Sequence, residues 1–219
     1  MAGAHRIGIL TSGGDAPGMN PAIRAIVRTA GAEGITCIGI RRGYAGLING
    51  DVFELTGNDV DGIARRGGTI LYTARSEEFR TEAGVDKAAK VCKYLGIDGL
   101  ITIGGDGTYR GALELARRGV RVVGIPATID NDMGCTEYTI GFDTALNTAV
   151  QSIDKLRDTS QSHDRCSVVE VMGRNAGHLA LYAGLATGAV ATLIPERPFD
   201  LDRDVVDLSL IHISEPTRP

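Results

Sequence analysis

The chain has 219 residues, of which 43% are apolar, enough to bury a core in one large or two small domains. Its formal net charge is −4, with 23 basic and 27 acidic residues mixed along the chain, which argues against a nucleic-acid or anionic-lipid partner. No apolar run is long enough for a membrane span, and the start MAGAHRIGIL lacks a signal-peptide pattern, so we expect a soluble cytoplasmic protein.

Short apolar runs alternate with helical patterns along the chain. Runs typical of buried strands cover residues 6–10, 36–40, 99–103, 120–125, 166–171 and 191–194. Helical periodicity covers residues 20–33, 81–95, 108–118, 143–159 and 176–186, with a shorter helix expected over 59–66. This alternation predicts an α/β fold in which helices cover both faces of a parallel sheet.

The four cysteines lie far apart in the sequence, at Cys37, Cys92, Cys135 and Cys166. Zinc sites and redox motifs use closely spaced pairs, and this spacing offers none. We expect buried or half-buried free thiols in a reducing compartment.

Residues 208–219, LSLIHISEPTRP, do not continue the preceding pattern. Leu208 to Arg218 can be back-translated into a transposase sequencing adapter, so we interpret the segment as a non-native tail. The alternative is an ordinary short amphipathic tail. On the first interpretation, the natural chain continues beyond Asp207.

Two loops after predicted strands are rich in glycine, as expected where open α/β sheets bind ligands. TSGGDAPGMN (11–20) contains Gly13 and Gly14, and GGDG (104–107) precedes a predicted helix. Free backbone N–H groups near a helix start bind anions, and Asp106 can hold a divalent cation shared with phosphate. The second loop therefore predicts a nucleoside triphosphate site, whereas the first is equally well explained as a tight turn.

Other loops carry arginines and carboxylates. Arg75 follows a Gly pair and can bridge phosphates, and Arg165 and Arg174 flank the predicted strand 166–171, where they could bind one sugar phosphate. In TIDND (128–132), Asp130 is a candidate proton acceptor for phosphoryl transfer and Thr128 can hydrogen-bond the acceptor. An Asx-rich turn that caps the next helix is the alternative for TIDND.

Six segments follow one another along the chain: GILTSGGDAPGMN, RGGTILYTAR, IGGDGT, TIDND, TIGFDTA and SVVEVMGRNAG. Together they closely resemble bacterial ATP-dependent 6-phosphofructokinases over about residues 6–200. The resemblance implies transfer of the γ-phosphoryl group of ATP to the 1-hydroxyl of fructose 6-phosphate, with Mg²⁺ as cofactor. It also implies a three-layer α/β/α Rossmann-like nucleotide domain at residues 1–140, and an incomplete α/β substrate domain at 141–207.

The resemblance assigns roles by position. The catalytic positions are Asp130 as general base, with Thr128, Asp132, Arg75 and Arg174. The ATP positions are Gly14, Tyr44, Arg75, Ser76, Gly105, Asp106, Gly107 and Thr108, with Asp106 as the magnesium ligand. The substrate positions are Thr128, Ile129, Asp130, Arg165, Met172, Gly173 and Arg174, with Arg165 contributed across a subunit interface.

Two positions bear on the phosphoryl donor. Pyrophosphate-dependent relatives usually carry Asp where this chain has Gly107 and Lys where it has Ala127, so both residues favour ATP. Ala127 also departs from the ATP enzymes, which commonly carry Gly there. The pyrophosphate-dependent enzyme, a non-catalytic regulatory protein of the same fold, and a GGDG phosphotransferase for a lipid or nicotinamide cofactor remain as alternatives.

Arg24, Arg28 and Arg157 match the family's allosteric site for a nucleotide or phosphoenolpyruvate. Gly57 and Val190 replace the usual arginine and glutamate, so we expect weakened or altered nucleotide activation. The family implies a homotetramer. Because its remaining substrate groups lie beyond Asp207, we expect the 219-residue chain to be inactive and prone to aggregate.

Overall fold

The computed structural model describes residues 5–163 and 165–207, so the predicted non-native tail at 208–219 lies outside the described residues. The chain divides into two compact units, which are described separately. Within the described residues, the first unit comprises 5–128 and 133–141, and the second comprises 129–132, 142–163 and 165–207. The assignment of a nucleotide domain and a substrate domain stays a prediction.

The first unit is built on a six-stranded sheet of order β3-β2-β1-β4-β5-β6. The strands are β1 (Arg6–Ser12), β2 (Thr36–Ile40), β3 (Val52–Glu54), β4 (Gly99–Gly104), β5 (Val122–Thr128) and β6 (Ile140–Gly141). All neighbouring strands are parallel except β2 and β3, which are antiparallel. The predicted α/β class with a mainly parallel sheet is confirmed.

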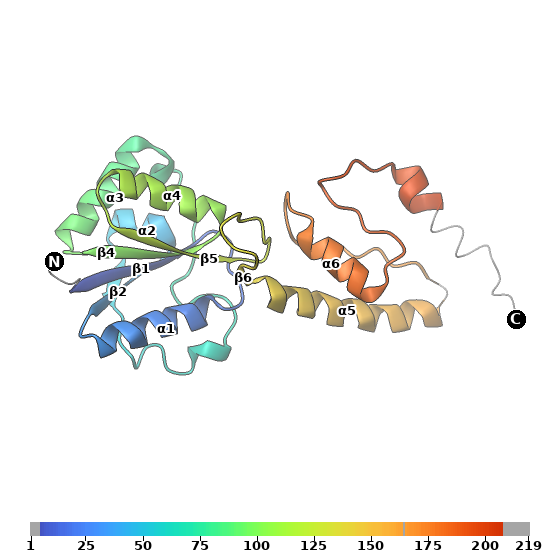
Figure 1. Ribbon diagram of the computed structural model, residues 1–219, viewed down its shortest axis with the longest axis horizontal. Helices are drawn as coiled ribbons and strands as arrows, with labels where there is room; N and C mark the ends of the chain where they lie inside the picture. The colour runs from blue at the N-terminus through green and yellow to red at the C-terminus, as the bar shows by residue number, and fades with distance from the viewer. Residues whose placement is uncertain (1–4, 164, 208–219) are drawn as a thin grey trace, which may run out of the picture. The chain divides into compact units, whose positions relative to one another are not determined.

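Helices cover both faces of this sheet, and the unit is therefore three layers thick. Helices α2 (Gly43–Asn49), α3 (Glu82–Tyr94) and α4 (Asp106–Arg117) lie on one face and α1 (Met19–Ala32) lies on the other (Figure 1). The core between the sheet and the three-helix layer is apolar and contains Leu10, Ile40, Leu47, Leu100 and Leu115, each at most 1% exposed. A completely buried Leu or Ile stabilises the fold by about 1.5–3 kcal/mol, so this layer holds the strand ends firmly in place.

Helix α2 was not predicted from the sequence, because its first residues are poor helix formers. It starts after Arg42, which has the left-handed φ of 57°, and continues through Gly43 at 58°. A Cβ at Gly46 would overlap the carbonyl group of Arg41. Tertiary packing of Leu47 and Ile48 therefore forms this helix where local propensity does not.

The second unit contains helices and extended segments. Helix α5 (Phe142–Ser162) packs on α6 (His178–Thr187), with an edge-on contact between Phe142 and Tyr182, and a π-helical turn covers Asp202–Val206. The predicted strands at 166–171 and 191–194 are wrong: within the described residues both segments are irregular and have no strand partner. An apolar, β-branched run forms a strand only when a partner strand lies beside it and completes its backbone hydrogen bonds.

Several other boundaries differ from expectation. The predicted helix at 59–66 is only the 3₁₀ turn η1 (Ile63–Arg65), a second 3₁₀ turn, η2 (Glu78–Arg80), precedes α3, and β5 extends through Thr128. Cys37 and Cys92 are buried as predicted, but Cys135 and Cys166 are exposed. No helix in the described part of the chain is long and apolar enough to cross a membrane.

Candidate functional site

The carboxyl ends of β1 and β4 are locked to the start of helix α4. The hydroxyl group of Thr108 donates a 2.9 Å hydrogen bond to the carbonyl oxygen of Ser12, the last residue of β1. A Cβ at Gly104 would overlap both this carbonyl oxygen and the Thr108 hydroxyl. Only glycine therefore fits at this position, and it allows the two loops to meet.

The predicted nucleotide loops leave glycine backbone exposed next to a helix start. Gly105 precedes the first turn of α4, and neither Gly14 nor Gly107 has another heavy atom within 4 Å of where a Cβ would lie. Gly13 adopts a φ of 87°, a conformation that favours glycine. Exposed N–H groups at the positive end of α4 form a favourable environment for phosphate.

Asp106 lies in the first turn of α4 and is exposed, with an ion pair of 2.9 Å to Arg110 one turn later. No group of three His, Cys, Asp or Glu side chains capable of holding a metal occurs within the described residues. Mg²⁺ in phosphoryl-transfer sites is usually held by one or two carboxylates together with substrate phosphates. A single carboxylate beside a predicted phosphate-binding loop fits this pattern.

Tyr44 occupies the core rather than an open cleft. It is 5% exposed, its ring stacks on Phe79 at a centroid distance of 4.0 Å, and its hydroxyl donates to the carbonyl oxygen of Thr108. Burial raises the pKa of this phenol well above its usual range, so it stays protonated. The Tyr44 hydroxyl therefore fixes the first turn of α4 from the side of the apolar core. Its predicted contact with ATP stays a prediction.

In the loop that contains Arg75 and Ser76, the serine side chain forms a local hydrogen bond, whereas the arginine side chain is exposed. The Ser76 hydroxyl accepts a 3.1 Å hydrogen bond from the N–H of Phe79, which lies in η2. The Arg75 side chain is exposed, and no ion pair ties it to another described residue. Its guanidinium group is therefore accessible to a ligand.

Two carboxylates and an arginine of the second unit form an electrostatic cluster. Asp130 is half-buried, and its pKa is raised, first by burial and then by the neighbouring charge of Asp132. Arg174 acts in the opposite direction and lowers that pKa. A carboxylate with a raised pKa binds a proton more readily, as required of a general base.

Two residues in or beside this charged cluster have unusual backbone conformations, one in the loop after β5 and one in the loop before α6. Asn131 and Arg174 are two of four non-glycine residues with positive φ among the described residues, at 51° and 54°. Beside Arg174, a Cβ at Gly173 would overlap the carbonyl oxygen of Ala176. Such conformations are sparsely populated and often occur in binding loops, where they fix side-chain direction.

The remaining predicted substrate residues are less organised. Arg165 and Met172 are both exposed. The carbonyl oxygen of Thr128 accepts a 2.6 Å hydrogen bond from the Thr139 hydroxyl, which fixes the end of β5. Ile129, between Thr128 and Asp130, is half-buried.

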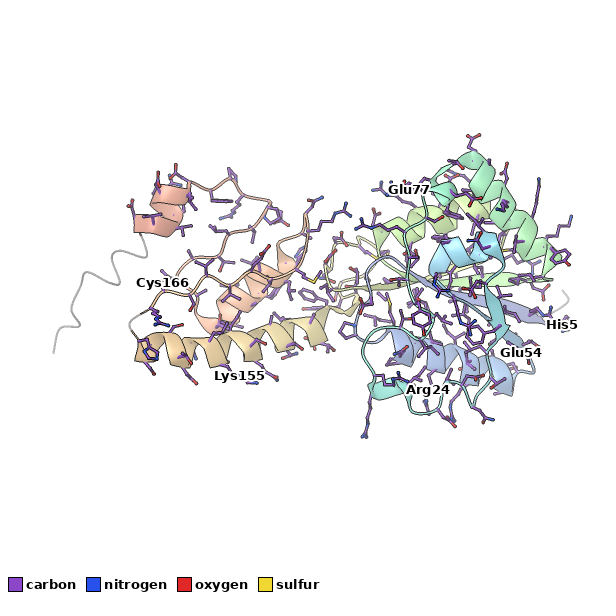
Figure 2. All side chains as sticks on the ribbon, turned by 180° about the vertical axis from the view of Figure 1, so that it is seen from behind. His5, Arg24, Glu54, Glu77, Lys155 and Cys166 are labelled. Atoms are coloured by element: carbon purple, nitrogen blue, oxygen red, sulfur yellow. The ribbon has the colours of Figure 1, made fainter. Side chains whose placement is uncertain are left out.

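Two of the three predicted allosteric arginines, Arg28 and Arg157, have protein partners. Arg28 on α1 forms an ion pair with Asp61, a partner that no sequence motif indicated. Arg24 lies one turn earlier on the same helix (Figure 2). Arg157 belongs to the second unit, where it donates to the carbonyl oxygen of Thr187 and pairs with Asp154 at 3.3 Å. A common site for the three stays a prediction.

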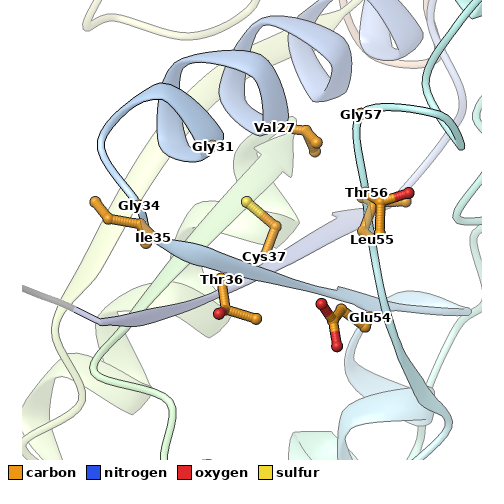
Figure 3. A pocket seen from close by; sticks show the side chains of 10 residues that line it. All are labelled: Val27, Gly31, Gly34, Ile35, Thr36, Cys37, Glu54, Leu55, Thr56 and Gly57. Atoms are coloured by element: carbon orange, nitrogen blue, oxygen red, sulfur yellow. The ribbon is translucent and has the colours of Figure 1, made fainter.

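The first unit also contains a pocket of about 290 Å³ away from the glycine loops. It lies between the end of α1, the start of β2 and the residues that follow β3 (Figure 3). Cys37, Glu54 and Gly57 line the pocket. The space beside Gly57 is empty, because no heavy atom lies within 4 Å of the position that a Cβ on Gly57 would take. Burial raises the pKa of the Cys37 thiol, which disfavours the reactive thiolate form.

Known proteins resemble this chain closely. A family model described as phosphofructokinase matches residues 6–215. The "ATP-dependent 6-phosphofructokinase" of Clostridium tetani (strain Massachusetts / E88) is 60% identical over 199 residues, covering 91% of this chain and 62% of the relative. The protein of the same name from Clostridium botulinum (strain Hall) is 60% identical over 197 residues, covering 90% and 62%. The chain thus spans about 62% of the length of these curated relatives.

Solved structures resemble it as well. Phosphofructokinase from Saccharomyces cerevisiae has a TM-score of 0.85 and 38% identity, covering 95% of this chain and 32% of that one. A pyrophosphate-dependent phosphofructokinase from Marinobacter aquaeolei has a TM-score of 0.75 and 22% identity, covering 93% of this chain and 58% of that one. The second likeness concerns the fold alone.

Proposed function

The chain belongs to the phosphofructokinase family, and from this membership we propose that it serves the transfer of the γ-phosphoryl group of ATP to the 1-hydroxyl of fructose 6-phosphate. The observation that carries the proposal is Asp130. It is a half-buried carboxylate with a raised pKa, two residues beyond the end of β5 and under the electrostatic influence of Arg174.

Each group has a defined task in this reaction. Backbone N–H groups around Gly14, Gly105 and Gly107 hold the phosphates of ATP, and Arg75 stabilises the charge that develops on them. Asp106 holds Mg²⁺, which supplies neutralisation of phosphate charge when bound. These residues act chiefly by positioning and electrostatic stabilisation.

On the acceptor side, Arg174 and the Arg165 contributed across a subunit interface bind the 6-phosphate. Met172 and Gly173 line the sugar site, and Thr128, Ile129 and Asp132 orient the acceptor. Asp130 accepts the proton of the 1-hydroxyl group as its oxygen forms a bond to the γ-phosphorus. The bond between that phosphorus and the β–γ bridging oxygen breaks, and ADP leaves. A general base of this kind contributes about 10²–10⁴-fold in rate.

The donor assignment to ATP rests on Gly107 and Ala127. Gly107 faces open space, so the effect of an Asp there would be its charge, which repels the α-phosphate of ATP. Ala127 is completely buried, and a lysine at this position would place an ammonium group in the core unless the strand moved. Both residues support ATP over pyrophosphate, which is the alternative donor.

We extend the proposal to assembly and regulation. A homotetramer, a cytoplasmic location and control by phosphoenolpyruvate or a nucleotide through Arg24, Arg28 and Arg157 follow from the family resemblance. Replacement of the expected arginine by Gly57 and of the expected glutamate by Val190 supports a weakened nucleotide effect.

The donor side is tested by fluorescence titration of the non-aggregated fraction of the chain, isolated by gel filtration, with a methylanthraniloyl derivative of ATP in the presence of Mg²⁺. We expect saturable binding, displaced by ATP far better than by pyrophosphate, and about tenfold weaker in Asp106→Asn, because a charged ligand group is lost. The matched control is Glu82→Gln, which removes an exposed carboxylate from the first turn of α3 and leaves affinity unchanged. Absence of binding, equal affinity in Asp106→Asn, or preference for pyrophosphate overturns the proposal.

A further inference from the structure

The side chain of Asn20 is buried at the start of α1 and is used completely by one distant loop. Asn20 is 1% exposed. Its Nδ2 group donates to the carbonyl oxygens of Arg66 and Gly67 at 3.0 and 3.3 Å, and its Oδ1 atom accepts from the N–H of Ile70 at 2.8 Å. One carboxamide thus binds three backbone groups of residues 66–70.

This loop keeps its shape through hydrogen bonds rather than through regular secondary structure. Residues 66–77 form neither helix nor strand, and Gly68 and Tyr72 adopt positive φ values of 68° and 56°. Further ties come from β1, where the Thr11 hydroxyl donates to the carbonyl oxygen of Tyr72 and lies 3.0 Å from the Thr69 hydroxyl. The N–H of Arg42 also donates to the carbonyl oxygen of Leu71 at 2.8 Å. The side chains of Thr11 and Asn20 supply the ties to β1 and α1.

Both segments joined by Asn20 belong to the proposed donor site. Asn20 follows the glycine loop that contains Gly14, and the tethered loop continues into Arg75. The two loops also lie side by side, because the Asp15 carboxylate is 3.7 Å from the position of a Cβ on Gly68. Loss of the tether would let Arg75 move relative to the glycine loop.

We propose that Asn20 is a positioning residue for the phosphoryl donor, whose carboxamide fixes the loop leading to Arg75 against the glycine loop of β1 and α1. The inference rests on the proposed function. An amide is required because the site presents two acceptors and one donor. A carboxylate satisfies only the donor and faces two carbonyl oxygens, and a hydrocarbon satisfies none.

The test combines local hydrogen exchange with nucleotide binding in Asn20→Asp and Asn20→Leu. We expect faster exchange in peptides covering residues 66–72, unchanged exchange in α3, and about tenfold weaker binding of the methylanthraniloyl ATP derivative, as expected when buried partners are left unsatisfied. The control is Thr102→Val, which removes a buried hydroxyl that has no partner in the described structure and leaves both readouts unchanged.

A pH series separates positioning from general loss of stability. A buried carboxylate that faces carbonyl oxygens has a raised pKa, and protonation lets it donate one of the lost hydrogen bonds. Relative to wild type at each pH, Asn20→Asp therefore recovers affinity and loop protection as pH falls from 7 to 5. Asn20→Leu does not recover.

The outcomes are distinguishable. A wild-type chain that binds no nucleotide refutes the proposed function and the positioning role with it. Wild-type binding with unchanged affinity in both Asn20 variants refutes the positioning role alone, even if loop exchange is faster. Unchanged exchange over 66–72, or equal recovery of both variants at low pH, also overturns it.

Discussion

At the scale of the residue, the charge environment of Asp130 predicts opposite effects of its two neighbours. Asp132 raises the pKa of Asp130 and Arg174 lowers it. Neutralising Asp132 with Asp132→Asn should therefore move the Asp130 pKa toward its ordinary value, whereas Arg174→Gln should raise it further. Carbon-13 NMR titration of the Asp130 carboxyl group measures both shifts without requiring turnover.

In the proposed reaction Asp130 must be ionised to accept a proton, so the same pKa shifts set the pH below which activity is lost. The Asp130 form able to accept a proton persists to lower pH in Asp132→Asn and disappears at higher pH in Arg174→Gln. Asp143→Asn, which changes an exposed carboxylate at the start of α5, serves as the control and leaves the titration unchanged. Shifts of the same sign in both variants would disprove this electrostatic account.

At the scale of the element, two glycines at the start of α4 should respond oppositely to alanine. A Cβ at Gly104 overlaps the Ser12 carbonyl oxygen and the Thr108 hydroxyl, so Gly104→Ala should destabilise the fold by about 1–3 kcal/mol. Gly107 faces open space without positive φ, so Gly107→Ala should stabilise it by about 0.4–1 kcal/mol. Urea denaturation of the two variants measures the difference. A destabilisation by Gly107→Ala equal to that by Gly104→Ala would contradict the packing described for the helix start.

The elements also mark how far the sequence predicts the structure. The buried strands β1 and β4 and the helix over Glu82–Tyr94 follow from apolar pattern and capping, since Thr81 accepts a hydrogen bond from the N–H of Gly84. The apolar run at 166–171 was wrongly predicted as a strand, because periodicity does not reveal whether a partner strand is present. Helix α2 was missed because its glycines are placed by contacts distant in the sequence.

In the candidate site too, some features are predicted from the sequence and others are not. Asp106, Asp130 and Arg174 are predicted from motifs, because the chemistry of phosphoryl transfer restricts residue types, and their roles stay predictions. The structural roles of Tyr44 and Thr108 could not be predicted from the sequence. Their hydroxyl groups donate to backbone carbonyl oxygens that only folding brings near. Asn20 was missed for the same reason, because its three partners are 46 to 50 positions away.

At the scale of the whole molecule, the two compact units should respond to different ligands. The glycine loops, Asp106 and Arg75 all belong to the first unit, whereas Asp130, Arg165 and Arg174 belong to the second. A ligand that binds only the folded state stabilises it by about 2.7 kcal/mol at a concentration of 100 times Kd. Mg²⁺ with ATP should therefore slow hydrogen exchange most strongly in β1, α1, β4 and α4. Fructose 6-phosphate should protect residues 129–132 and 172–177. At the same ATP concentration, Asp106→Asn should reduce the first effect by about half, because tenfold weaker binding leaves about 1.4 kcal/mol of stabilisation, and it should leave the second effect intact. ATP protection spread equally over both units would contradict the separate placement of the donor and acceptor residues.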